Sequence, residues 1–139
     1  MNKIKLVNDS LESANVDSSI KIEYFEKECL FAINEIKIDV VSDSTLDLDI
    51  NLKDESKLNF NIKIEDNVTF NLNIMTYGVG GKIQYKYNLN ENSICNIFKF
   101  QNVDSIKEMI IAELKGEKAT INYNFKTISN SKETYDYHI

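Results

Sequence analysis

The sequence predicts an all-β protein, a parallel β-solenoid in which each strand turns a corner and stacks on a later coil. Three observations lead to this fold. Apolar and polar residues alternate strictly over several segments, these segments recur every ten to twelve residues, and the links between them contain almost no glycine. An antiparallel β-sandwich made of hairpins is the alternative, because the alternation alone fits both folds.

The regular part of the chain begins at Leu46, where leucine or isoleucine occupies every second position up to Leu52. The same phase returns twelve residues later at Leu58 and again at Val68. Strict period-two alternation directs one set of side chains inward and the Asp, Asn and Lys set outward. The strands expected in this way are 46–52, 58–64, 68–74, 83–89 and 119–125, with a less regular one at 94–100.

The links between these strands favour corners over hairpins. They contain "KDES", "EDN" and "NENS", whereas tight hairpins favour Asn-Gly or Asp-Gly. Asn and Asp also tolerate the left-handed backbone region, so the sandwich stays open at this point. In a solenoid, strands two links apart would lie about 4.8 Å from each other. Leucine, isoleucine and phenylalanine would then stack inside, and rows of asparagine would form a solvated outer face.

The remaining segments complete a single domain. Residues 1–19 are expected to be a polar N-terminal lead-in, and residues 20–139 a single β-solenoid domain. The segment 103–114, "VDSIKEMIIAEL", has Ser105 and Glu108 at capping-box spacing, which would suit a helix. It also fits a strand with Met109 and Ile111 on one face, and we favour the strand because its neighbours are strands.

Composition excludes some function classes. The 139 residues carry a net charge of −6, and their sixteen basic side chains are all lysine. Phosphate recognition depends on cationic surface and arginine forks, so nucleic acid is not an expected partner. No apolar run is long enough to cross a bilayer, and the N-terminus has no signal-peptide core. We expect a cytoplasmic protein with no membrane partner, in which Cys29 and Cys95 are reduced thiols.

The last third of the chain resembles a known family. Its three segments are "FQNV" at 100–103, "LKGEKATINYN" at 114–124 and "SKETYDYH" at 131–138, with "GGK" upstream. In order and spacing they are similar to the Gln-Asn turn, the Leu-x-Gly-x-x-Ala rung and the Asp-x-His strand of the SufB/SufD family of iron–sulfur cluster assembly proteins. The resemblance implies a right-handed parallel β-helix.

The resemblance also implies a function, that of a non-enzymatic scaffold or partner in iron–sulfur cluster assembly. Its expected partners are an ABC-type ATPase and a paired SufB/SufD-like subunit. The family's N-terminal extension and its ATPase-docking helical region have no counterpart in this sequence, and its cluster-holding cysteine and histidine belong mostly to the latter part. The alternative is a β-solenoid interaction module that has lost the assembly role. A carbohydrate-active β-helix enzyme is the weakest hypothesis.

The candidate metal ligands are His138, Asp136 and Cys95, of which Asp136 and His138 match motif positions of the family. Iron–sulfur and zinc sites commonly need four ligands, and this sequence has two cysteines and one histidine. A cluster would therefore have to be completed at an oligomer interface, and no other cofactor is implied. Cys95 is out of phase with Phe98 but in phase with Ile97, so its facing stays open. A buried structural thiol is the favoured interpretation.

Two other motifs have ordinary explanations. "GVGGK" at 78–82 lacks the spacing and the following helix of a phosphate loop, so a flexible loop between rungs is expected. Four aspartates could suggest a cation or sugar site, but solvation of an outer face explains them better. These are Asp43, Asp47, Asp49 and Asp54. Because the end strand of a solenoid invites pairing, we expect a homodimer through a coil end or edge.

Overall fold

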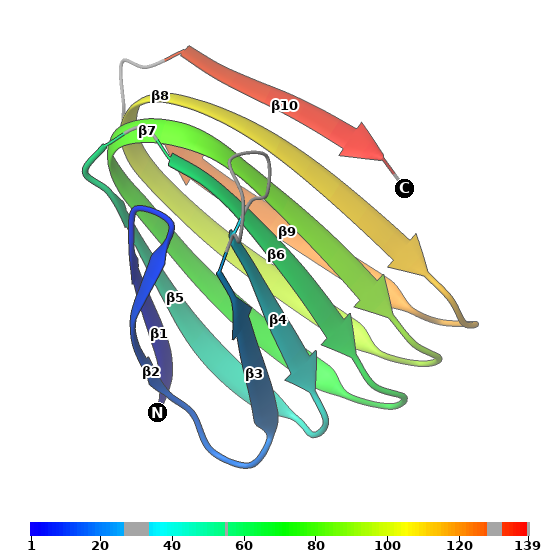
Figure 1. Cartoon of the computed structure of the whole chain (residues 1–139). Helices are drawn as coiled ribbons and strands as arrows, with labels where there is room; N and C mark the ends of the chain where they lie inside the picture. Colours follow the sequence, from blue (N-terminus) through cyan, green and yellow to red (C-terminus); the bar gives the residue numbers. More distant parts are fainter. Residues whose placement is uncertain (27–33, 55, 128–131, 139) are drawn as a thin grey trace.

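The computed structural model in Figure 1 is a β-solenoid of about four turns. It describes residues 1–26, 34–54, 56–127 and 132–138, the last range as backbone only. All regular elements in this part of the chain are strands, which confirms the expected fold class. None of the described residues forms a helix long and apolar enough to cross a membrane.

The strands form two parallel ladders that are joined at corners (Figure 1). Two long strands, β7 and β8, bend through both ladders and tie them together. The first ladder contains β1 (Asn2–Val7), β5 (Ser44–Leu52), the first half of β7 (Thr69–Leu89), the first half of β8 (Ile94–Leu114) and β9 (Thr120–Thr127). The second contains β4 (Asn34–Val40), β6 (Ser56–Ile64), the second halves of β7 and β8, and β10 (Lys132–His138).

The register repeats once per coil. Ser44 pairs with Phe70, and Ile94 pairs with Thr120, so 26 residues separate each pair. Strands two links apart in sequence are therefore neighbours in a parallel ladder, as the spacing predicts. Among the described strands, antiparallel pairing occurs only between β1 and β2 (Ser10–Asn15) and between β3 (Ile20–Phe25) and β4.

The N-terminal residues take part in the solenoid. Residues 1–19 were expected to be a polar lead-in, but β1 lies parallel to β5 and its Ile4 and Leu6 are buried. β2 and β3 then fold back on β1 and β4. Antiparallel neighbours of this kind occupy hydrogen-bonding groups that a strand edge would otherwise leave open.

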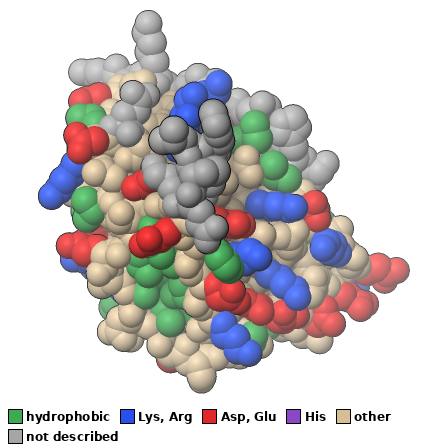
Figure 2. Space-filling model, viewed as in Figure 1, with side chains coloured by type: hydrophobic (Ala, Val, Ile, Leu, Met, Phe, Trp, Pro, Cys, Tyr) green, Lys and Arg blue, Asp and Glu red, His purple; other side chains and the backbone are tan. Residues whose placement is uncertain are grey.

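The core lies between the two ladders and is built from the inward set of each strand. Phe60, Tyr85 and Tyr87 stack inside it, with ring centroids 5.2 and 6.2 Å apart. Each large apolar side chain of this kind contributes about 2 kcal/mol by burial. Figure 2 shows lysine, aspartate and glutamate side chains spread over the visible face among uncharged groups, with clusters of hydrophobic groups between them.

Corners depend on residues that accept a left-handed backbone. Asn67, Asn92 and Lys118 occupy equivalent corners of successive coils, with φ of 61°, 56° and 60°. Asparagine adopts this conformation at low cost, which explains why the links need so little glycine. The corners also stack, because the backbone N–H of Asn67 donates to the backbone carbonyl oxygen of Glu91 at 3.0 Å.

The expectation of a flexible loop at "GVGGK" was wrong. These residues form a tightly packed corner within β7, and Gly78 and Gly80 have φ of 117° and 128°. A Cβ at Gly80 would lie 1.5 Å from the backbone oxygen of Ser105, and one at Gly78 would lie 2.3 Å from that of Leu52. Glycine is required here because neighbouring coils approach too closely for any side chain.

The segment 103–114 is a strand, as favoured, and forms the end of the first half and the whole second half of β8. Ile106, Ile110 and Ala112 are buried in the core, whereas Met109 and Ile111 are half-buried in the opposite phase. Neighbouring strands on both sides, β7 and β10, determine this conformation through parallel pairing.

Candidate functional site

Cys95 lies at the start of β8 and faces the core. Its side chain is fully buried in phase with Ile97, whereas Phe98 points outward and is half exposed. The sequence did not show whether Cys95 faces the core or the solvent, and the structure shows that it faces the core. Burial raises the pKa of the Cys95 thiol to about 12. Because the thiolate is the form that binds metals, Cys95 has the character of a structural thiol.

The other candidate ligands lie on β10. The backbone of Asp136 pairs with Met109 and that of His138 pairs with Ile111. Their side chains, and Cys29, lie outside the described residues, so the predicted ligand set stays a prediction. Within the part of the chain whose side chains are described, no three His, Cys, Asp or Glu residues converge as a metal site would require.

The aspartates of the outer face connect coils. An Asp43 carboxylate oxygen accepts the amide of Thr69 at 2.8 Å, and Asp47 accepts the side-chain amide of Asn73 at 3.0 Å. Asp49 accepts the hydroxyl of Tyr77, and this bond, together with partial burial, raises the pKa of Tyr77. Each of these carboxylates, on β5 or just before it, therefore accepts a hydrogen bond from a residue of the neighbouring strand β7.

A row of asparagines continues this pattern. Asn96 donates its side-chain amide to Asn71 at 3.0 Å, and Asn122 donates to Asn96 at 2.9 Å. Asn71 in turn donates to Thr45. Identical side chains stacked in register form such ladders because each amide is both donor and acceptor. The asparagine rows predicted from the sequence are thus hydrogen-bonded as well as solvated.

An ion pair lies inside the solenoid. Lys99 from the first half of β8 and Glu108 from the second half meet across the core, and both side chains are fully buried. The Lys99 ammonium also lies 4.7 Å from the ring centre of Tyr85 and 5.9 Å from that of Phe125. This pair joins the two ladders within one coil.

This pair was not predicted from the sequence. The signal was present, since Lys99 follows Cys95 and Ile97 at period two and therefore shares their inward phase. Gln101 continues the same inward row and is also buried. Desolvation of the two charges offsets much of their attraction, so a buried pair of this kind adds little net stability over an apolar pair of similar volume.

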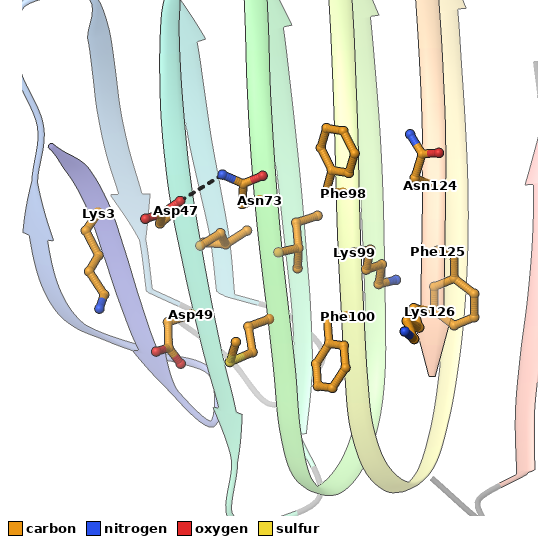
Figure 3. Close-up of a pocket in the computed structure, with 13 residues that line it drawn as sticks. Lys3, Asp47, Asp49, Asn73, Phe98, Lys99, Phe100, Asn124, Phe125 and Lys126 are labelled. Atoms are coloured by element: carbon orange, nitrogen blue, oxygen red, sulfur yellow. Dashed lines mark hydrogen bonds between the residues drawn. The ribbon is translucent and has the colours of Figure 1, made fainter. Parts of the chain in front are cut away.

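The outer face of the first ladder carries apolar side chains at its centre. Two rows cross the strands there, and Figure 3 shows both. One row consists of Asp47, Asn73, Phe98 and Asn124, and the other of Asp49, Met75, Phe100 and Lys126. We call Met75, Phe98 and Phe100 the outer strip. It borders a hollow of about 570 Å³ on the surface.

The outer strip is unusual for its surroundings. Phe98 and Met75 are 52% and 49% exposed, although most other outward positions of β5 and β7 are polar. Grouped exposed aromatic and methionine side chains with a polar border are typical of protein interaction sites. The sequence showed the pattern as apolar residues out of phase in 94–100.

Comparison of the chain with family models, with curated proteins and with solved structures finds no match.

Proposed function

We propose that this chain is a non-enzymatic, partner-binding β-solenoid of the SufB/SufD type that acts in iron–sulfur cluster assembly. The observation that carries the proposal is the agreement between the resembling segments and the coil geometry. Segment 100–103 ends the first half of β8, and segment 114–124 spans the end of β8, a corner and β9. Segment 131–138 supplies β10.

Several residues of these segments lie where the solenoid requires a buried side chain or a glycine. Gln101 and Val103 are buried in the inward row. At the corner, a Cβ on Gly116 would lie 2.4 Å from the Cα of Glu91, so the glycine of the "LKGEKA" segment allows two corners to stack. The residues that carry the resemblance are thus ones that the stacking of coils requires. This supports a fold of the family's type as the reason for the resemblance.

The distribution of chemistry favours binding over turnover. The buried ion pair and the buried Cys95 are enclosed in the core, whereas the apolar outer strip lies on the surface beside a hollow. An exposed apolar strip of this kind is typical of a surface that binds another protein. A candidate ABC-type ATPase and a paired SufB/SufD-like subunit are the partners that we propose.

The second candidate is a β-solenoid interaction module without the assembly role. The structural character of Cys95 favours it, because a described cysteine that could have served a cluster is instead part of the core. A cluster held at an oligomer interface would then use Asp136 and His138 together with ligands from another chain.

An anaerobic pull-down of the tagged protein from its own host lysate, with ATP present, tests the proposal. Co-elution of an ABC-type ATPase, a cysteine desulfurase or a second SufB/SufD-like subunit is the expected result. Gly80→Ala, which disrupts the corner, serves as the misfolded control. Recovery of the protein alone would reject the assembly role and leave the interaction module.

A further inference from the structure

We propose that the outer face of the first ladder binds a second copy of this chain, so that two solenoids pack face to face through the outer strip. This inference does not rest on the role in cluster assembly. Two sheets can pack face to face at about 10 Å, with side chains interdigitating between them. Phe98 and Phe100 project from the middle of this face in Figure 3, and Met75 pairs with Phe100 on the neighbouring strand.

Charge complementarity identifies the occupant as a second copy. In the row that contains Met75 and Phe100, Asp49 lies on β5 beside Met75, and Lys126 lies on β9 beside Phe100; the row continues past Asp49 to Lys5 on β1. A two-fold axis parallel to the strands, between β7 and β8, reverses the order of strands in the facing copy. Each Asp49 then faces Lys126 of the second copy, and each Met75 faces Phe100.

The same pattern excludes the other simple arrangement. A two-fold axis across the strands would place β5 over β5, so that Asp49 would face its own copy and Lys126 likewise. Like charges opposed in this way are unfavourable. Lys3 and Lys5 lie on β1 next to Asp47 and Asp49, outside the paired region when the axis lies between β7 and β8.

The area is consistent with a weak dimer. Four strands from β5 to β9 at 4.8 Å spacing, over eight residues each, give a projected face of roughly 500 Å². A standard interface buries about 800 Å² per partner, so we expect a dissociation constant in the micromolar range. The rim is polar, with Asn73 and Asn124 beside the apolar centre, as in other interfaces.

Sedimentation equilibrium from about 1 µM to 1 mM tests this proposal. The wild-type chain should show a monomer–dimer equilibrium, and Phe98→Ser should weaken it at least about tenfold. Leu114→Ser is the matched control, because Leu114 is similarly exposed at the end of β8, away from the outer strip. It should leave the equilibrium unchanged, and thermal unfolding should confirm that both variants fold.

Charge exchange provides the second arm. Asp49→Lys and Lys126→Glu should each weaken the dimer, and the double variant should restore it, because each copy would again present opposite charges. A protein that stays monomeric over the whole range overturns the proposal and leaves the outer strip to another partner. A dimer that Phe98→Ser does not weaken also overturns it, since a coil-end contact would behave in that way. So does a double variant no better than the single ones.

Discussion

Replacement of Lys99 by methionine should destabilise the protein strongly. The change removes the cation from a fully buried ion pair and leaves the Glu108 carboxylate in the core. Loss of one partner of a buried pair costs about 3–5 kcal/mol, and loss of the cation–π contact with Tyr85 adds about 1 kcal/mol. A domain of this size has about 5–15 kcal/mol in total, so the variant should lose a large part of its stability.

Urea unfolding measures this loss. With a slope of about 2 kcal/mol per molar, the midpoint of Lys99→Met should fall by roughly 2 M. The double variant Lys99→Met/Glu108→Leu should recover most of the loss, because an apolar pair of similar volume replaces a buried ion pair without a large penalty. Lys107→Met, an exposed lysine on the same strand, is the control and should change stability by less than about 0.5 kcal/mol.

Two results would refute this reasoning. A loss below about 1 kcal/mol for Lys99→Met would mean that water or other groups solvate Glu108 in the core. A double variant as unstable as Lys99→Met would mean that packing, and not the loss of the ion pair, determines the cost. The double-mutant cycle separates these terms because both residues are in direct contact.

Four further predictions follow from single features. Iodoacetamide at pH 8 should alkylate native Cys95 orders of magnitude more slowly than the same cysteine in the unfolded chain, because a pKa of about 12 leaves about one thiolate in ten thousand. Equal rates in site-resolved mass spectrometry would contradict this. The same raised pKa should make stability fall as pH rises from about 9 toward 12. Asn96→Ala should cost about 1–2 kcal/mol by breaking two ladder hydrogen bonds, whereas the exposed Asn102→Ala should cost less than about 0.5, as measured by urea midpoints. Gly80→Ala should prevent folding or cost more than about 3 kcal/mol, with Val79→Ala as a mild control, and a native circular-dichroism melt for Gly80→Ala would reject the tight corner. Burial raises the pKa of Asp39, and so does a hydrogen bond that its protonated carboxyl donates to the Glu65 carboxylate. Stability should therefore fall as pH rises from 3.8 through this raised pKa. Asp39→Asn should remove that dependence and stabilise the chain by a few tenths of a kcal/mol at pH 7, because solvent screens this partly exposed group.

Local alternation was enough to predict most of the fold. Leu46 to Leu52 and their successors at Leu58 and Val68 have one apolar side chain at every second position, and register then follows from burial of one face. The lack of glycine in the links favoured corners over hairpins, and the structure shows that left-handed asparagines at 67 and 92 form those corners. These features act within a few residues, which is why a single sequence shows them.

Features that depend on neighbouring coils were harder to predict. "GVGGK" suggested a flexible loop because glycines show only local freedom, whereas the backbone oxygens of Leu52 and Ser105 determine its packing. Lys99 and Glu108 are nine residues apart, and only the bend of β8 between the ladders brings them together. The outer strip has a similar origin, because Met75 and Phe100 are neighbours only through the parallel register.

The role in cluster assembly is tested most directly by removing the gene from its host and measuring an enzyme that carries a [4Fe–4S] cluster. We predict that the activity falls while the amount of that polypeptide stays constant, and that chemical reconstitution of the cluster restores it in the extract. Re-expression of the wild-type chain should restore it in the cell. Unchanged activity, or a loss that reconstitution does not repair, would contradict the assembly role.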